Sequence, residues 1–550
     1  MQIFILLLFY FLILFSILGY GRIVTLFNSN YQASSFDGLI GISFLILISF
    51  ATNIFFAHNY VHNILVLFIG LFFFIFDLKK NFVKRKKDLK LLLIVFSIIF
   101  IGLLMYKNHD DFYYYHFSYS LILTNFQKIF GLGNLNHGFR TPSSIFYLNS
   151  LFFLPGIKYY LMNAGAIYIF GFANLVLLEL ISDFIKKNKK NFILFLTLLS
   201  FIYINSKFSR FSEHGTDLSA IILIFLMAIY YLISINNSNQ HKQTAFFNEY
   251  FIKINILLII IISLKTFYII YLIVYLAWIY ENKKFFYNNN IIKIIITNFS
   301  TYVFIFILFF VFFTIFSNTG CLVYPASFTC FDNFSWSIPL ENVEQMKLWY
   351  EQWSKAGAGP DFRVENPELY INKFNWFENW FKLYFFTKVS DNLFVLAVIS
   401  LIAFVFFYYK NQKKIKIQAK YLLFYLIIFI LFAEWFYNHP ALRYGGYALL
   451  ALLVFIPVSL YLSKLKLDTV IIKKRVYLLI IFSFLIFFSK NVSRIFDEHN
   501  KYDYNPMENA FFYLNKDGFK INDTVGNFLK NKSIEDNSFF FILNKKTMLK

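Results

Sequence analysis

Apolar positions in this chain occur in long runs that alternate with short polar stretches. A bilayer core about 30 Å thick needs roughly 20 apolar residues per helix, so the runs that approach this length are candidate membrane spans. The pattern predicts an all-α polytopic membrane protein with about 12–14 transmembrane helices. Fourteen candidate spans are found, at residues 2–20, 39–57, 60–77, 91–106, 158–181, 191–205, 217–235, 253–265, 266–280, 294–316, 391–409, 421–437, 446–463 and 476–489.

Lysine and arginine gather in short clusters between some of these runs, and basic loops of membrane proteins remain on the cytoplasmic side. The segments expected to face outward are a first loop at 107–157, a second at 317–390 and the C-terminal residues 491–550. We expect the first loop to carry helices that lie along the membrane surface, and the last segment to form a tail or a small outward domain after a membrane region at 1–490. The clusters that orient the helices lie at 78–90, 186–190, 410–420 and 464–475.

The stretch 254–280 is long enough for one helix, with Lys265 near its middle. A single crossing would place the basic clusters at 410–420 and 464–475 outside, against the orientation that they favour. We therefore expect two short passes, with Lys265 at the outer turn between them, lining a cavity.

Composition supports this membrane assignment, since 59% of the residues are apolar and 15% are charged. A formal net charge of +21 would suggest a nucleic-acid partner in a soluble protein. Here the basic residues mark topology, so the expected partner is the lipid bilayer and no nucleic acid is expected.

The stretch "NHDDFYYYHF" at 108–117 follows the fourth run and opens the first outward loop. Asp110 and Asp111 should lie between a membrane span and a surface helix predicted over 113–130, where a carboxylate can reach both a lipid head group and a soluble acceptor. One of them is a candidate general base; the alternative is that one caps the following helix. A second short helix is expected after Thr141, with Pro142 at its first position.

Three histidines of this loop, His109, His116 and His137, could form a metal site with an aspartate, but no pair has a strong ligand spacing. The sequence therefore supports no metal ligands and no cofactor. His116 is a candidate to orient the base, and His137 a candidate substrate contact.

Cations near the outer interface are the second signal, because they are costly in lipid. Arg140, Lys265 and Arg443 are candidates to bind a phosphate or pyrophosphate group. The alternative for each is ordinary snorkelling to the interface.

The stretch "SEHGTDLSA" at 212–220 adds three further candidate substrate-binding residues to the same face, Glu213, His214 and Asp217. The alternative for Asp217 is a cap of the seventh span.

The second outward loop contains the only cysteines, Cys321 and Cys330. Their spacing in an outward loop predicts a disulfide in an oxidising compartment. The tryptophans and tyrosines that follow, over 340–381, suit either sugar stacking or anchoring at the membrane interface.

Five stretches resemble a family of large bacterial inner-membrane proteins, which is in turn similar to the GT-C superfamily of polyprenyl-phosphate-sugar-dependent glycosyltransferases. They are "DFYYYHF", "GLGNLNHGFRTPSSIFYLNSLFFLP", "GCLVYPASFTCFDNFSWSIP", "WYEQWSKAGA" and "NHPALRYGG". The resemblance implies a GT-C-like fold with an acidic residue near the start of the first outward loop, acting as base. By position that residue is Asp111, which favours it over Asp110. The Asp-x-Asp and Glu-x-Asp forms of some members are missing, which gives no support for metal dependence.

The expected activity is transfer of a sugar from a polyprenyl-phosphate donor to a glycan or lipid acceptor at the periplasmic face of the bacterial inner membrane. Asp111 would take the acceptor proton, and the three cations would neutralise the departing phosphate. The alternatives are a glycan polymerase or ligase of the outer face, and a transporter or flippase of lipid-linked saccharides.

Overall fold

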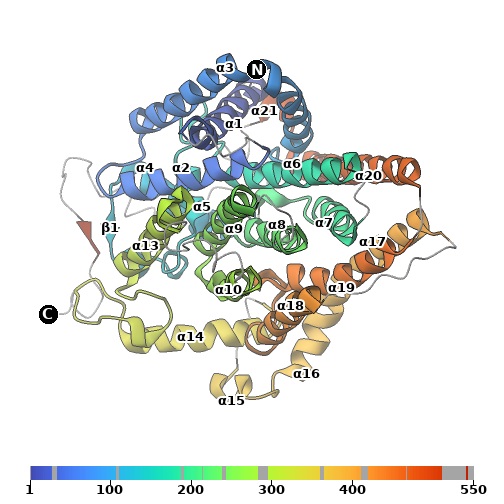
Figure 1. The fold of residues 1–550 in the computed structure, drawn as a ribbon. Helices are drawn as coiled ribbons and strands as arrows, with labels where there is room; N and C mark the ends of the chain where they lie inside the picture. The colour runs from blue at the N-terminus through green and yellow to red at the C-terminus, as the bar shows by residue number, and fades with distance from the viewer. Residues whose placement is uncertain are drawn as a thin grey trace.

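The computed structural model of the chain (Figure 1) describes residues 2–27, 34–106, 109, 111–187, 191–213, 215–237, 243–282, 295–359, 364–409, 419–465, 468–510 and 540–542. In the first half the elements are α1 (Gln2–Phe27), α2 (Asp37–Asn53), α3 (Tyr60–Ile99), η1 (Phe100–Gly102), η2 (Phe112–His116), α4 (Phe117–Asn125), β1 (Ile129–Phe130), η3 (Leu132–Asn134), η4 (His137–Phe139), α5 (Ser144–Ser150), α6 (Gly165–Lys186), α7 (Phe192–Lys207), η5 (Phe211–Glu213), α8 (Gly215–Asn237) and α9 (Gln243–Leu264). In the second half they are η6 (Thr266–Tyr271), α10 (Leu272–Glu281), α13 (Phe299–Thr319), η7 (Ser327–Thr329), α14 (Leu340–Lys355), α15 (Pro367–Ile371), α16 (Phe377–Trp380), η8 (Phe381–Val389), α17 (Ser390–Phe407), α18 (Ala419–Asn438), η9 (Leu442–Tyr444), α19 (Gly446–Ser463), α20 (Thr469–Tyr502), α21 (Pro506–Asn509) and β2 (Phe540–Phe541).

The protein is an all-α, multi-pass membrane protein. Among the described residues, eight helices are long and apolar enough to cross a membrane. Three shorter apolar helices, at Asp37–Asn53, Phe192–Lys207 and Thr266–Glu281, match further predicted spans. The eight are Gln2–Val24, Tyr60–Val83, Gly165–Lys186, Gly215–Asn236, Phe299–Thr319, Phe377–Phe407, Tyr421–Asn438 and Gly446–Ser463.

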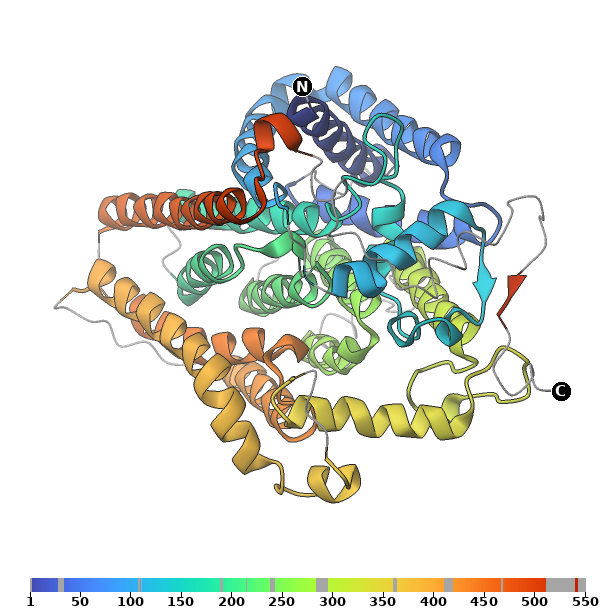
Figure 2. The same ribbon diagram turned by 180° about the vertical axis from the view of Figure 1, so that it is seen from behind.

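Helices α6, α8 and α9 form the middle of the molecule, with α1 and α3 on one side and α17, α18 and α19 on another (Figures 1 and 2). Almost every side chain in the described part of α8 is buried, as are those of α9 from Tyr250 to Leu264. Their apolar sequences are continuous and show no polar face, which is the pattern of a helix surrounded by other helices. The first turn of α8 and the end of α9 are therefore fixed by the core.

The chain breaks at Lys265, as predicted, because this residue has an extended conformation between α9 and η6 (φ −158°, ψ 118°). Helix α10 then returns beside α8 and α9. Trp278 of α10 contacts Phe251 of α9, with ring centroids 6.3 Å apart, and its Nε1 donates to Ser234 Oγ of α8 at 2.6 Å. Residues 254–280 are thus two antiparallel passes.

The basic stretch 78–90 is helical, although it was expected to be a loop between two spans. Helix α3 continues through it and bends at Asn81, whose φ of −128° and ψ of 20° are not helical. Lysine and arginine are good helix formers, so the helix has no reason to end there. Asp77 stabilises the bend by pairing with Arg85 at 3.3 Å, and with Arg22 of α1 at 3.0 Å.

The first outward loop does contain two short helices, but they are buried under other elements and do not lie exposed on a surface. The helix predicted over 113–130 ends at Asn125, and α5 begins at Ser144, two residues later than its expected start at Pro142. All seven residues of α5 are buried. The two helices are also bonded to each other inside the protein, because Ser120 Oγ of α4 donates to the Phe146 carbonyl of α5 at 3.0 Å.

The predicted boundary between residues 490 and 491 falls inside α20, which continues to Tyr502. Arg494 Nη2 donates to the Leu104 carbonyl at 2.6 Å, so this part of α20 packs on the membrane region. Most of the expected C-terminal domain, at 511–539 and 543–550, lies outside the described residues. Strand β2, within the described residues 540–542, pairs in parallel with β1 in the first loop.

Candidate functional site

Asp217 is a buried carboxylate that holds two basic side chains. It lies in the first turn of α8, and its side chain is only 7% exposed. Oδ1 accepts a hydrogen bond from Lys265 Nζ at 2.7 Å, and Oδ2 accepts one from Arg443 Nε at 2.8 Å. A buried charge is tolerated when it is paired and hydrogen-bonded, and both conditions are met here. The position in the first helical turn is favourable as well.

Local backbone geometry brings the two cations to this carboxylate. Lys265 occupies the extended residue between α9 and η6. Arg443 lies in η9, between α18 and α19, and its carbonyl accepts a hydrogen bond from the Tyr268 hydroxyl at 2.9 Å. Gly445 ends this turn with a φ of 98°, a conformation that favours glycine. The turn and the hairpin therefore fix both cations before any ligand binds.

Asp111 lies next to this group. It directly precedes η2, and its Oδ2 is 4.0 Å from Arg443 Nη1 and 3.6 Å from His109 Nδ1. Its side chain is about one-third exposed, in contrast to Asp217. Asp111, Asp217, Lys265 and Arg443 are called the ion-pair cluster below. The cluster has two formal charges of each sign, and only Asp111 among its carboxylates is accessible.

Aromatic rings surround the cations of the cluster. Lys265 Nζ is 4.3 Å from the centroid of the Tyr444 ring, and Arg443 Cζ is 5.5 Å from that of Trp353 on α14. Cation–π contacts of this kind favour the charged forms of both side chains. Burial raises the pKa of Tyr444 to about 12. The Asp217 and Asp111 charges also raise this pKa, whereas the Arg443 charge lowers it. The Tyr444 hydroxyl therefore stays protonated at neutral pH.

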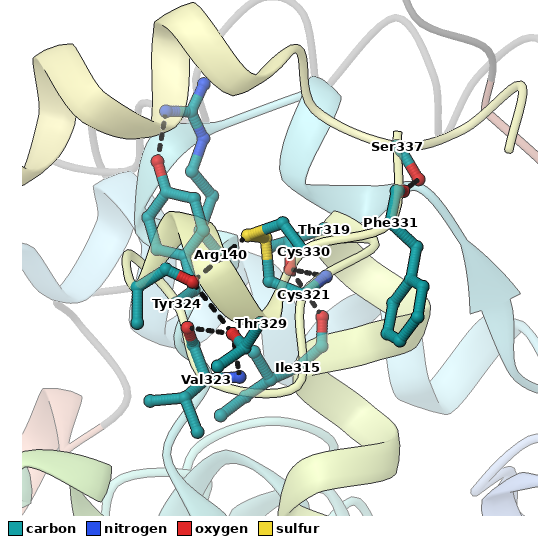
Figure 3. Close-up of a disulfide and its surroundings, with 11 residues drawn as sticks. Arg140, Ile315, Thr319, Cys321, Val323, Tyr324, Thr329, Cys330, Phe331 and Ser337 are labelled. Atoms are coloured by element: carbon teal, nitrogen blue, oxygen red, sulfur yellow. Dashed lines mark hydrogen bonds between the residues drawn. A yellow bond between two sulfur atoms is a disulfide. The ribbon is translucent and has the colours of Figure 1, made fainter. Parts of the chain in front are cut away.

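Arg140 lies in a second group, beside the disulfide loop. Its Nη1 donates to the Tyr324 hydroxyl at 2.9 Å, and its Nε donates to the Gly133 carbonyl at 3.2 Å. Tyr324 belongs to the loop that the predicted disulfide between Cys321 and Cys330 closes, and this disulfide is confirmed (Figure 3). The second outward loop thus positions a cation of the first.

His137 connects the two groups electrostatically. Its Nδ1 lies 3.2 Å from the Tyr114 hydroxyl in η2. Partial burial and the nearby Arg140 charge lower the pKa of His137, whereas the Asp111 charge raises it. Both Arg140 and Asp111 are therefore close enough to act on this imidazole, which stays mainly neutral near pH 7.

Other predicted site residues are placed elsewhere or not described. His116 packs against Phe146 of α5, with ring centroids 5.0 Å apart, so its role as an orienter of the base remains a prediction. Glu213 ends η5, close in sequence to Asp217. Asp110 and His214 lie outside the described residues.

A metal site in a protein needs several His, Cys, Asp or Glu side chains around one point. Within the described part of the chain, no group of three or more His, Cys, Asp or Glu side chains is arranged to hold a metal ion. The cluster itself has only two carboxylates, and each lies near a cation.

Three residues of the site were missed by sequence reasoning: Tyr444, Trp353 and Tyr324. Tyr444 could have been found, since it adjoins Arg443 in "NHPALRYGG". Trp353 and Tyr324 likewise lie in the quoted stretches "WYEQWSKAGA" and "GCLVYPASFTCFDNFSWSIP", but in a chain with 39 tyrosines and 7 tryptophans nothing singled them out within these stretches.

Comparison with known proteins gives one match. The model of a family described as a domain of unknown function, DUF8201, matches residues 1–450. No curated protein and no solved structure matches the chain. The matched range includes the whole ion-pair cluster, Arg140 and the disulfide loop.

Proposed function

This chain belongs to the DUF8201 family, whose function is unknown, and we propose that it is a membrane glycosyltransferase of the GT-C type. It moves a sugar from a polyprenyl-phosphate donor to a glycan or lipid acceptor. The reaction takes place at the periplasmic face of the bacterial inner membrane, with Asp111 as general base. The resemblance of "DFYYYHF" and "NHPALRYGG" to sequences of this kind supplies the reaction class.

One observation carries the proposal: an accessible carboxylate, Asp111, lies 4.0 Å from a guanidinium that a second, buried carboxylate holds in place. Arg443 Nε donates to Asp217, and Nη1 of the same guanidinium is the atom that lies 4.0 Å from Asp111 Oδ2. A base beside a fixed phosphate-binding group is what transfer from a phosphate-linked sugar requires.

The proposed step balances without a further reactant. The Asp111 carboxylate takes the proton of the acceptor hydroxyl, and the acceptor oxygen forms a bond to the anomeric carbon. The bond between that carbon and the phosphate oxygen breaks, and the polyprenyl phosphate leaves with the electron pair. Attack opposite the leaving group inverts the anomeric centre.

Arg443 and Arg140 are the cations best suited to the departing phosphate. Arginine binds phosphate in bidentate fashion. Lys265 already donates to Asp217 at 2.7 Å. It therefore neutralises part of the Asp217 charge, and Arg443 keeps more of its positive charge for the phosphate. Of the three predicted phosphate ligands, Arg443 and Arg140 are therefore the two that we expect to contact the phosphate directly.

The GT-C arrangement itself is part of the proposal. Support comes from the position of Asp111 at the start of the first loop, ahead of the short helices η2, α4 and α5. The return of the C-terminal β2 to β1 in this loop fits an outward-facing C-terminal segment.

Sugar transfer in nanodiscs tests the proposal. The wild type and Asp111→Asn are given a panel of polyprenyl-phosphate sugars with a crude glycan extract. We expect transfer by the wild type, and a loss of about 10²- to 10⁴-fold in Asp111→Asn, the range typical of general-base catalysis. Asp183→Asn is the matched control, because Asp183 is an exposed aspartate at the end of α6.

Equal transfer by wild type and Asp111→Asn would contradict the assignment of the base and favour the ligase, which relies on arginine and histidine. Accumulation of an unchanged lipid-linked saccharide on the far side of sealed vesicles, without any transfer, would favour a transporter.

A further inference from the structure

The disulfide loop, defined as residues 320–338, has two faces of opposite character. Tyr324 is buried and accepts the Arg140 hydrogen bond, so this face points toward the candidate site. The loop also exposes four large apolar side chains: Leu322, Phe328, Phe331 and Phe334. Figure 3 shows the rings of Tyr324 and Phe331 on opposite sides of the disulfide. Phe328 is 91% exposed, which is costly in water.

The exposed apolar face continues a stripe on α13, a helix suited to cross the membrane. Phe309, Phe313 and Phe316 are four and three residues apart, so they share one face of the helix. The rings of Phe309 and Phe313 are stacked, with centroids 6.1 Å apart. The apolar stripe therefore runs along α13 to the start of the loop.

Ring contacts carry the stripe from the helix into the loop. The Phe316 centroid is 6.0 Å from that of Phe331 and 5.6 Å from that of Phe334. Phe309 on this stripe is exposed and belongs to a candidate span, so it is expected to face lipid. The loop extends the same surface past the end of the helix.

Several backbone groups of the loop are hydrogen-bonded within it, as is needed in a segment that enters an apolar medium. Leu322 N donates to the Thr329 carbonyl at 3.1 Å, and Phe331 N donates to the Gly320 carbonyl at 2.9 Å. The Thr329 hydroxyl donates to the Val323 carbonyl at 2.9 Å.

Charge is nearly missing from the loop, because Asp332 is the one charged residue between 320 and 338. Protein interfaces have a polar rim, and anionic surfaces are met by lysine and arginine. A loop without lysine or arginine, continuous with the exposed apolar stripe of α13, fits the apolar part of a membrane interface.

From these observations we infer that the disulfide loop inserts Phe328, with its apolar neighbours, into the lipid interface. The bilayer thereby holds the loop that positions Arg140 through Tyr324. This inference does not depend on the proposed activity, since it rests on the loop and α13 alone.

Photo-cross-linking in nanodiscs tests the inference. The photoreactive residue p-benzoylphenylalanine replaces Phe328 in one variant, Phe309 in a second and Glu344 in a third. Phe309 lies on the exposed face of α13 and serves as the positive control, and Glu344 is exposed on the charged helix α14 and serves as the negative control. We expect lipid adducts at Phe328 at least about tenfold above Glu344 and comparable to Phe309, equally with neutral and anionic lipids.

Given lipid adducts at Phe309, a yield at Phe328 no higher than at Glu344 would overturn the inference. A cross-linked second copy of the chain, a cross-linked soluble protein, or adducts formed with anionic lipid alone would overturn it as well. Phe328 is exposed, so its replacement leaves the fold unchanged, and mass spectrometry without reduction verifies the Cys321–Cys330 bond.

Discussion

Asp217 is the residue on which the ion-pair cluster depends. It is the buried member, and it bonds both cations, whereas Asp111 approaches Arg443 without a hydrogen bond. The sequence indicated all four residues: Lys265 and Arg443 because cations are costly in lipid, Asp111 as a candidate base and Asp217 as a candidate substrate contact. It did not show which would pair, because Asp217, Lys265 and Arg443 are brought together by contacts between α8, the α9–α10 hairpin and η9. The pairing is therefore a property of the tertiary structure.

Asp217→Asn is expected to destabilise the protein. Breaking a buried ion pair costs about 3–5 kcal/mol, and we expect about 3 kcal/mol because Lys265 and Arg443 are partly exposed. Thermal unfolding in detergent measures the effect. The double variant Asp217→Asn with Lys265→Met should recover part of the loss, since it leaves one cation fewer without a partner. An unchanged unfolding temperature in Asp217→Asn would contradict the pairing.

Lys128 is a buried lysine outside the cluster, and it gives a prediction about pH. It is 3% exposed, and its Nζ lies 3.4 Å from the Tyr147 hydroxyl. Burial lowers its pKa to about 7 from 10.5. Between these two values the unfolded chain binds the proton and the folded protein does not, so stability rises with pH across this window. Below about pH 7 both states are protonated, and the cost of burying the charge is complete.

Lys128→Met should therefore stabilise the protein at pH 6 by more than the ~1–3 kcal/mol that a neutral unpaired polar group costs, because Lys128 is charged at this pH. It should also flatten the dependence of the unfolding temperature on pH between about 7 and 10. Differential scanning calorimetry at a series of pH values measures both effects. Lys347→Met, at an exposed position of α14, is the control. A pH dependence equal to that of the wild type would show that Lys128 does not cause it.

At the scale of elements, the pattern of apolar runs located the helices well. It was wrong for the basic stretch 78–90, which was expected to be a loop and is part of α3, and for α4, which was expected on the membrane surface and is mostly buried. In α3 the helix preference of lysine and arginine continues the helix, whereas α4 is covered by the elements packed on it. The prediction of a break at Lys265 was correct because it followed from the positions of the basic clusters along the whole chain, and not from local helix preference.

The α9–α10 hairpin gives a prediction at this scale. Trp278 Nε1 donates to Ser234 Oγ, and both side chains are buried. Ser234→Ala leaves the indole N–H without this acceptor, so we expect a loss of about 0.6–2 kcal/mol. In Trp278→Phe the serine change should cost much less, because the donor is gone. A double-mutant cycle on unfolding free energies measures the coupling, and a coupling near zero would contradict the bond.

At the scale of the whole molecule, the basic stretches and the ion-pair cluster lie toward opposite ends of two helices, α7 and α18. Helix α7 runs from the basic stretch 186–190 toward Asp217, and α18 runs from the stretch 410–420 toward Arg443. Basic stretches of membrane proteins are retained in the cytoplasm, so we expect the cluster on the opposite side. The C-terminal region was less predictable, because α20 crosses the expected boundary at 490 and packs on the membrane region.

Cysteine labelling in sealed vesicles checks this orientation. Lys186→Cys should react with a membrane-impermeant maleimide only from the cytoplasmic side, and Glu344→Cys only from the other side. The native cysteines are joined and do not react. Labelling of both positions from one side would contradict the orientation.

The central claim is that Asp111 acts as a base beside a guanidinium that Asp217 holds in place. The most direct measurement is the single-turnover rate of sugar transfer by Asp111→Asn saturated with a lipid-linked donor, with donor binding measured on the same sample. We predict a rate lowered by about 10²- to 10⁴-fold with donor affinity within a few-fold of the wild type, because Arg443 and Arg140 are unchanged. A wild-type rate in the folded Asp111→Asn protein would contradict the account.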